Sequence, residues 1–522
     1  MKRAPSLPWL VAALALPACL LFGTLQHDVA FWDVGELQTV PYIFGIAHPT
    51  GFPTFVMYGW LLAHAFPFGT VAARISAVAA LGTIAAAAAA YRIVWVLTRY
   101  APSAFATPLL LVSSSIVWSR GTRADVHPVA LAFAAWAFAS ALTYRSSHRP
   151  RDLALAGLFV GLGLATHPVV VWTVPALLIL LIASGGAPWR VFAITATAII
   201  AGLSPYAYLP LRSAQITALR LDPTLRLGFG PGMPFWDYAH TANLRNFWWL
   251  VSGAQFHRAA GFATYVDVLR YPALARTFFS VVHANFGWPI LLLAIAGAAA
   301  MVHRSAIPTL ALAAFAVVGI PFALGYTEEA DKERYLLQAL WAISIFAALG
   351  LATLSELVAS GHRSLRAMVI AAASIALTGF TTYAHRGIIL QNRDAVARHY
   401  LDELRTLTPD GTIVVAAWTY ATPVAYGTFV DGTLGNRVIV TAEPATVAGR
   451  IIGWSAVRCV VIVTDDSSQR MPRGLALRIL QTRIPRLTAV RAASFGDRCR
   501  RAAVSGAMGS AESRLRARIA VP

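Results

Sequence analysis

Two carboxylates stand three residues apart in the stretch Asp33-Val-Gly-Glu36, and a proline- and glycine-rich turn, His-Pro-Thr-Gly-Phe-Pro, follows at 48–53. Acids are expensive in or near a bilayer and persist mainly where they do chemistry. If 33–36 is helical, the spacing puts both carboxylates on one face. One of them can then act as a general base, while the other holds a substrate group, a cation or a partner arginine.

The composition indicates which class of protein must position these acids. Of the 522 residues, 57% are hydrophobic and only 12% are charged, whereas a soluble domain carries about 25% charged residues. The chain is therefore expected to be an integral membrane protein. Its net charge of +19 comes almost entirely from arginine, with lysine only at Lys2 and Lys332. These arginines are scattered and form no compact basic stripe, so we expect anionic lipid or a phosphate-bearing substrate and no nucleic acid.

Apolar segments of spanning length recur along the chain, and several are shorter than the usual ~20 residues. The segment 152–184 is expected to be two short helices that turn at His167-Pro168, and 53–67 a helix at the outer surface. We predict about eleven spans: 8–25, 72–98, 104–119, 126–144, 152–167, 168–184, 190–211, 280–302, 305–325, 335–357 and 366–384.

The positive-inside rule orients these spans with the N-terminus in the cytoplasm of a bacterial inner membrane and the C-terminal region outside. The basic residues that then share the cytoplasmic side are Lys2, Arg3, Arg92, Arg99, Arg145, Arg149, Arg151, Arg190, Arg304, Arg363 and Arg366. The acids that face outward are Asp28, Asp33, Glu36, Asp125, Glu328, Glu329, Asp331 and Glu333.

The predicted organisation is an all-α polytopic membrane bundle over 1–384, followed by a soluble extracytoplasmic α/β domain over 385–522. The first outer loop is 26–71. The large outer loop, 212–279, is rich in tryptophan and is interpreted as an interfacial lid, with binding of an acceptor or a lipid tail as the alternative. Cys459 and Cys499 could pair if the C-terminal domain is extracytoplasmic. That domain is predicted to contain a helix near 394–407 and strands at 412–417, 437–441 and 458–464.

The chain resembles the GT-C class of glycosyltransferases in having an outer loop with Asp-x-x-Glu, many spans and an outer C-terminal domain. The pattern 33–53 is similar to that of a bacterial family related to protein O-mannosyltransferases, Asp-x-Gly-Glu and then His-Pro-Pro-Gly-Tyr-Pro. The chain departs from it at Thr50 and Phe52. The resemblance covers roughly residues 10–360. Further similar stretches are Gly161-Leu-Gly-Leu-Ala-Thr-His167, Tyr208-Leu-Pro-Leu-Arg212 and Asp331-Lys-Glu-Arg334-Tyr335.

This resemblance implies an inverting transfer of a sugar such as mannose from a polyprenyl-phosphate donor to a protein, glycan or lipid acceptor on the outer face. By the same analogy Asp33 is the catalytic base and Glu36 the supporting acid. The alternative is an interfacial acid pair that Arg123 or Arg334 neutralises for structural reasons alone.

A lipid-phosphate leaving group needs stabilisation as its charge develops, and the chain has no glycine-rich phosphate loop. An outer arginine or lysine is the remaining option, because arginine binds phosphate in a bidentate fork. Arg334 and Lys332 are the first choices, with Tyr335 beside them, and Arg123 and Arg212 come next. An ordinary interfacial arginine is the competing interpretation for each.

His48, His127 and His167 all map to the outer side. With Glu36 they could bind a divalent metal, but their separations match no standard ligand spacing. We therefore expect histidines that contact substrate or form structural hydrogen bonds, and no cofactor is assigned. The residues interpreted as shaping the turn are Pro49, Gly51 and Pro53.

Other functions remain open from the sequence. A transporter or lipid-carrier flippase often has two similar halves with broken helices at matching positions, and no such repeat is visible. A non-catalytic membrane scaffold is the third interpretation. It predicts that replacing Asp33 by asparagine leaves function intact.

Overall fold

Hydrophobic helices account for most of the chain. The computed structural model describes residues 6–185, 187–259, 262–327, 331–464, 476–482, 485–490 and 499. Four residues used in the orientation argument lie outside this part: Lys2, Arg3, Glu328 and Glu329. The chain divides into two units, Met1–Ala397 and Arg398–Pro522.

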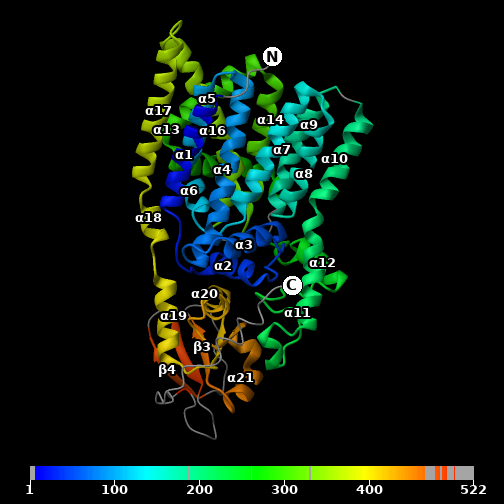
Figure 1. Ribbon diagram of the computed structural model, residues 1–522, viewed down its shortest axis with the longest axis vertical. Helices are drawn as coiled ribbons and strands as arrows, with labels where there is room; N and C mark the ends of the chain where they lie inside the picture. The colour runs from blue at the N-terminus through cyan, green and yellow to red at the C-terminus, as the bar shows by residue number, and fades with distance from the viewer. Residues whose placement is uncertain are drawn as a thin grey trace. The chain divides into compact units, whose positions relative to one another are not determined.

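The first unit is a bundle whose longer helices lie side by side along the vertical axis of Figure 1. Its α-helices are α1 (Leu7–Gly23), α2 (Trp32–Ile43), α3 (Pro53–Ala65), α4 (Val71–Thr98), α5 (Ala101–Val112), α6 (Ser115–Gly121), α7 (His127–Ser147), α8 (Pro150–Leu164), α9 (Val174–Ile182), α10 (Pro188–Gly202), α11 (Tyr208–Ala218), α12 (Leu244–Val251), α13 (Tyr271–Arg304), α14 (Ala306–Val317), α15 (Ile320–Gly325), α16 (Leu337–Val358), α17 (Arg363–Ala384) and α18 (Gly387–Asn392). Its short 3-10 helices are η1 (Pro168–Thr173), η2 (Ser204–Ala207), η3 (Pro223–Leu227), η4 (Ala254–Phe256), η5 (Phe262–Tyr265), η6 (Val268–Arg270) and η7 (Lys332–Leu336).

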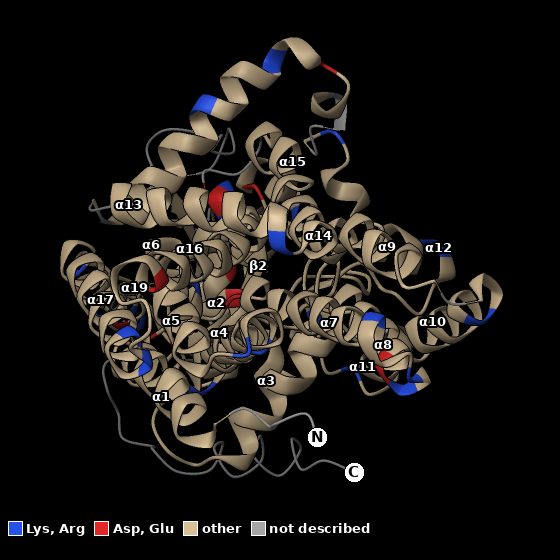
Figure 2. Ribbon diagram, turned by 90° about the horizontal axis from the view of Figure 1, so that it is seen from above, with Lys and Arg blue, Asp and Glu red and all other residues tan. Residues whose placement is uncertain are grey.

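The predicted spans fall on helices, but 104–119 is broken between α5 and α6, and the number of spans is not confirmed. Within the described residues, six helices are long and apolar enough to cross a membrane, or seven if α5 and α6, bent by 77°, form one span. Helix α1 and the segment Pro168–Ile182 are apolar but shorter. The predicted turn at His167 separates α8 from η1, as expected. Seen along the bundle, charged residues are few among the helices (Figure 2).

Helices α13 and α16 cross at very short range. A Cβ added to Gly297 would lie 1.9 Å from the carbonyl oxygen of Phe346, and one added to Gly350 would lie 1.9 Å from that of Leu293. Only glycine allows the two backbones to approach this closely, as small residues do at helix contacts in membranes. The crossing fixes α16, and the segment just before α16 carries Arg334.

The break between α5 and α6 is stabilised by a single buried amide. The Asn285 side-chain oxygen accepts hydrogen bonds from the Ser114 hydroxyl at 2.8 Å and from the Ile116 backbone N–H at 3.0 Å. Polar groups freed by a break inside a membrane bundle must find partners within the protein. Asn285 supplies them, and it thereby fixes α6, which ends beside Arg120.

The second unit is built on one mixed sheet. Strands β2 (Val438–Thr441), β1 (Ile413–Ala416) and β3 (Val460–Thr464) are parallel, while β5 (Arg486–Val490) and β4 (Leu477–Gln481) complete the order β2-β1-β3-β5-β4 with antiparallel pairings. The predicted helix and three predicted strands are confirmed; β4 and β5 were not predicted. The other α-helices are α19 (Val396–Leu407), α20 (Trp418–Phe429) and α21 (Ala448–Ser455). A disulfide joins Cys459 and Cys499.

Candidate active site

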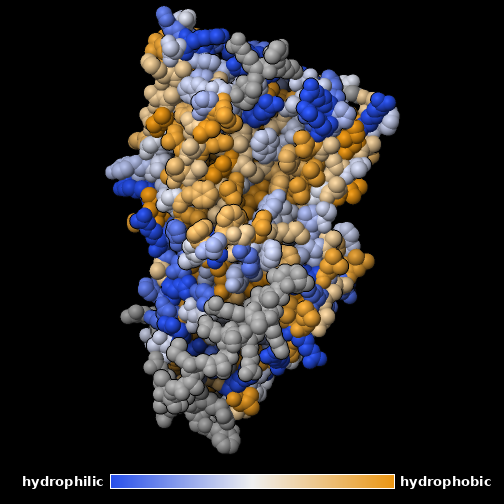
Figure 3. Space-filling view, viewed as in Figure 1, coloured by the Kyte–Doolittle hydropathy of each residue, from blue (hydrophilic) through white to orange (hydrophobic). Residues whose placement is uncertain are grey.

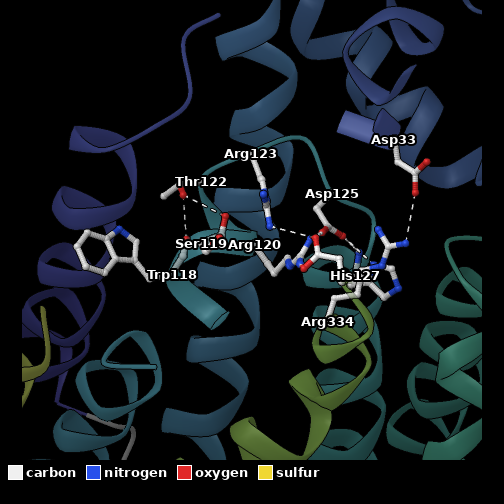
Figure 4. Close-up of polar contacts among 10 residues, drawn as sticks. Asp33, Trp118, Ser119, Arg120, Thr122, Arg123, Asp125, His127 and Arg334 are labelled. Atoms are coloured by element: carbon white, nitrogen blue, oxygen red, sulfur yellow. Dashed lines mark hydrogen bonds and ion pairs between the residues drawn. The ribbon is translucent and has the colours of Figure 1, made fainter. Parts of the chain in front are cut away.

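Asp33 stands in the first turn of α2, as the i,i+3 argument requires, because the stretch 32–43 is helical. A carboxylate is favoured there by the exposed N–H groups of the helix start. The Asp33 carboxylate lies 3.3 Å from the Arg334 guanidinium (Figure 4). Its side chain keeps 24% of its surface accessible, so this acid is both paired with a cation and reachable.

Glu36, one turn further along α2, has a different environment. Its side chain is fully buried, and one carboxylate oxygen accepts the backbone N–H of His48 at 2.8 Å. The other carboxylate oxygen contacts His48 Nδ1. Burial lowers the pKa of His48, but the negative charges of Glu36 and Asp33 outweigh it, so this pKa is raised. Glu36 therefore holds the turn, whereas the Asp33 side chain is partly exposed.

The turn after α2 has the shape expected from its sequence. The Gly51 N–H donates to the His48 carbonyl at 2.7 Å, and Gly51 has φ +84°, a value that side chains rarely adopt. Pro53 is the first residue of α3, a position where proline is favoured. The His48 ring packs edge-on against Phe52 at 4.9 Å. The turn thus presents His48 toward the acid pair.

A second group of charges gathers at the loop between α6 and α7 (Figure 4). Arg120 donates to Asp125 at 3.3 Å and contacts Asp331, and Arg123 lies 3.4 Å from the other Asp331 oxygen. Both arginine side chains are largely buried. Burial and the neighbouring Arg120 lower the pKa of Arg123 to about 10, so it stays charged at neutral pH. Burial opposes ionisation of Asp331, yet the two arginines outweigh it and lower its pKa.

Two of the predicted histidines meet beside this charged group. The rings of His127 and His167 are 4.4 Å apart, and Tyr335 lies edge-on to His127 at 5.1 Å. His127 Nδ1 bonds to Asp125 at 2.7 Å, while its buried Nε2 has no hydrogen-bond partner among the described residues. His167 Nδ1 accepts from the Val169 N–H, which leaves Nε2 as the protonated nitrogen of the neutral ring.

Two other predicted phosphate ligands donate to backbone carbonyls. Arg212 donates to the carbonyls of Phe44 at 2.6 Å and Ile43 at 3.1 Å, so it caps the C-terminus of α2, about 16 Å along the helix from Asp33. Lys332 donates to the Leu324 carbonyl at 3.2 Å. The structure therefore brings Arg334 to Asp33 and Arg123 to Asp331, whereas Arg212 lies at the other end of α2.

The described residues form no assembled divalent-metal site. Nδ1 of each of the three histidines is engaged, by Glu36, by Asp125 and by a backbone N–H. Within the described part of the chain, no three His, Cys, Asp or Glu side chains come close enough to hold an ion.

Sequence reasoning did not select Arg120, nor Asp125 and Asp331 as site residues, nor Tyr238 of the large loop. Arg120 directly follows the predicted span 104–119, and the available signal was an arginine at the end of an apolar segment, five residues before Asp125. Tyr238 is brought in by a bridge between Ile46 and Asp237. Burial, aided by the charges of Glu36 and Asp33, raises the pKa of Tyr238 to about 12, so its hydroxyl stays protonated near the acids.

The chain is similar to known proteins in this same region. Residues 33–187 match the family described as the protein O-mannosyl-transferase TMEM260 N-terminal domain. Protein O-mannosyl-transferase TMEM260 of Mus musculus is 28% identical over 220 residues, which are 40% of this chain and 31% of that protein. The homologue from Dictyostelium discoideum is 34% identical over 79 residues, 14% of this chain and 10% of that protein. The chain thus matches less than a third of either relative's length.

The fold has a solved counterpart. The structure of ArnT from Cupriavidus metallidurans, determined with undecaprenyl phosphate and in the apo state, superposes with a TM-score of 0.55. The likeness covers 93% of this chain and 98% of ArnT at 12% sequence identity. At that identity the likeness shows a shared fold, which agrees with the expected GT-C-like architecture.

Proposed function

We propose that this chain is an inverting membrane glycosyltransferase, which moves a sugar from a polyprenyl-phosphate donor to an acceptor hydroxyl on the outer face of the cell membrane. The observation that carries the proposal is the contact between Asp33 and Arg334, beside the Glu36–His48 pair. The two acids, the turn and the α6–α7 loop all fall within the stretch that matches protein O-mannosyl-transferases. Mannose is therefore the first sugar to test, and a protein hydroxyl the first acceptor.

The geometry gives each group a step in a single displacement. The acceptor oxygen attacks the anomeric carbon, its bond to that carbon forms, and the bond from the carbon to the phosphate oxygen breaks on the opposite side. Asp33 takes the acceptor proton, as a reachable carboxylate can. The polyprenyl phosphate that leaves carries negative charge, which Arg334, with Arg123 and Arg120 nearby, would stabilise.

The remaining residues hold this arrangement. Glu36 fixes His48 through both its backbone and its ring, so His48 can donate to a substrate hydroxyl from a set position. His127, His167 and Tyr335 form an aromatic wall that could pack against the sugar or the first units of the lipid.

For the membrane topology we propose about eleven spans in a bacterial inner membrane, with the N-terminus in the cytoplasm and the C-terminal domain outside. The disulfide between Cys459 and Cys499 supports the outer placement, because disulfides persist in oxidising compartments.

The test uses the purified full-length chain in lipid nanodiscs, with polyprenyl-phosphate-[3H]mannose as donor and membranes from cells lacking the gene as acceptor. We expect release of polyprenyl phosphate and tritium in a macromolecular product, both reduced about 100-fold or more in Asp33→Asn. Glu356→Gln is the matched control, since this exposed acid pairs with Arg304 at the far end of α16. Wild-type turnover by Asp33→Asn, or no turnover of mannosyl, glucosyl and galactosyl donors by the wild type, would overturn the proposal.

A further inference from the structure

Helix α12 exposes an apolar face. Leu244, Trp248 and Trp249 are 71%, 59% and 38% exposed. Leu244 and Trp248 are one turn apart, and Trp249 lies beside them on the exposed side of the helix together with Arg245. Figure 3 shows hydrophobic surface at the level where Figure 1 labels α12. The outer face of a helix in water is normally polar, so this face needs a covering.

The opposite face of α12 is attached to two parts of the first unit. Leu250 is fully buried and packs against the turn. A Cβ added to Gly51 would lie 3.1 Å from the Leu250 side chain. The Phe247 ring lies edge-on to Tyr206 at 6.5 Å, and Tyr206 belongs to the candidate span Pro188–Ala218. That span is about 46 Å long, more than the ~30 Å hydrocarbon core. Helix α12 is therefore tied to the protruding end of a membrane helix.

Charge around α12 is of one sign. Between residues 219 and 259 the two acids, Asp222 and Asp237, are buried at 2% and 1% exposure. The arginines in the same stretch are all exposed: Arg220, Arg226, Arg245 and Arg258. The surface that this segment presents is thus apolar and cationic, with its negative charges turned inward.

We infer that α12 docks on the headgroup layer of an anionic lipid bilayer, with its Leu and Trp side chains at the acyl boundary and with Arg245 and the arginines of the flanking segment on the lipid phosphates. Tryptophan prefers this boundary. A short amphipathic helix lies in it with its apolar face buried about 5–10 Å, and arginines near an anionic surface are attracted to it. The docked helix would hold the turn at Gly51 against the membrane surface.

Spin-label accessibility tests the inference in the full-length protein, independently of transfer activity. A nitroxide is attached at Trp248→Cys in a Cys19→Ser background, because Cys19 is the free cysteine and the other two are paired. Phe192→Cys, on the exposed face of α10, calibrates lipid, and Glu443→Cys, exposed in the second unit, calibrates water. Accessibility to O2 and to a water-soluble nickel complex is measured in phosphatidylglycerol-rich and in phosphatidylcholine vesicles.

We expect the label at 248 to favour O2, as the label at 192 does, at a shallower depth. We also expect it to lie deeper in the phosphatidylglycerol-rich vesicles, and Arg245→Ser with Arg258→Ser to abolish that difference. Accessibility equal to that at 443 would overturn the docking. Equal depth in both vesicles would overturn the anionic preference.

Discussion

Arg334 lies 3.3 Å from Asp33, although 301 residues separate them in the sequence. The contact joins the start of α2 to the segment before α16, so the acid is correctly placed only when both ends of the first unit have assembled. A cation beside a carboxylate favours its ionised form, which is the form a general base requires. The same arginine would meet the departing phosphate. A purely structural ion pair would give the same distance, and kinetic measurements distinguish the structural role from the catalytic one.

Arg334→Gln should lower kcat with the polyprenyl-phosphate donor by about 10²–10³-fold, the usual effect of removing one group that stabilises developing charge. Arg304→Gln serves as the control, since Arg304 pairs with Glu356 on the exposed surface. Steady-state kinetics and thermal unfolding are measured together. If Arg334→Gln loses thermal stability but keeps its kcat, the pair is structural only.

The Glu36–His48 pair predicts how stability depends on pH. Because the pKa of His48 is raised in the folded protein, protonated His48 stabilises the fold fully below its unfolded pKa of about 6.5. That contribution is lost as pH rises through the folded pKa. The stability difference between wild type and Glu36→Gln should therefore shrink as pH increases from about 5 to 9. A difference that is constant over this range contradicts the prediction, and Glu356→Gln should show no such trend.

Much of the fold was accessible from hydropathy and turn residues. Three elements follow from local patterns that tertiary contacts did not override: the helical turn at Asp33, the break at His167-Pro168 and the strand Val460–Thr464. The bend at Ser113–Ser114 was invisible, because both flanks are apolar and the amide that satisfies it, Asn285, is distant in sequence. Strands β4 and β5 carry charged residues such as Arg478 and Arg486, which obscured their alternation.

The part of the candidate site whose residues are close in sequence was the easiest to predict. Asp33, Glu36 and the turn form one local pattern, so their types and spacing sufficed. Arg334 was preferred over Arg212 from the sequence, but the contact that each arginine makes needed three-dimensional information. In the structure Arg212 donates to carbonyl groups at the end of α2, whereas Arg334 lies at Asp33.

Asn392 should act as a positioning residue for the arginine loop. Its amide donates to the Thr24 carbonyl at 2.8 Å and to the Thr122 hydroxyl at 2.7 Å, and Thr122 lies between Arg120 and Arg123. Asn392→Ala leaves these acceptors unpaired, which costs about 1–3 kcal/mol. We expect a lower unfolding temperature and a higher KM for the donor, measured beside Gln391→Ala, its exposed neighbour. Unchanged KM would show that the loop does not depend on this amide.

The disulfide gives a direct test of topology. Cys459 and Cys499 are paired and Cys19 is the free cysteine. A maleimide-polyethylene glycol reagent added to denatured, unreduced protein from cells should therefore label one cysteine and increase the mass by one polymer chain. After reduction all three cysteines should react. Three reactive thiols without reduction would place the C-terminal domain in a reducing compartment.

The crossing of α13 and α16 makes the sharpest stability prediction. In Gly297→Ala the new Cβ would overlap the Phe346 carbonyl oxygen, which is backbone and cannot swing away. The helices must separate, and overpacking of this kind costs about 1–3 kcal/mol or more. Gly379→Ala in α17 is the matched control, because nothing lies within 4 Å of its Cβ, and alanine there should raise helix stability by up to about 1 kcal/mol. Thermal unfolding in detergent should therefore move in opposite directions for the two variants. Because α16 follows directly after η7, the Gly297 variant should also lose transfer activity through displacement of Arg334, and equal melting temperatures for both variants would contradict the close crossing.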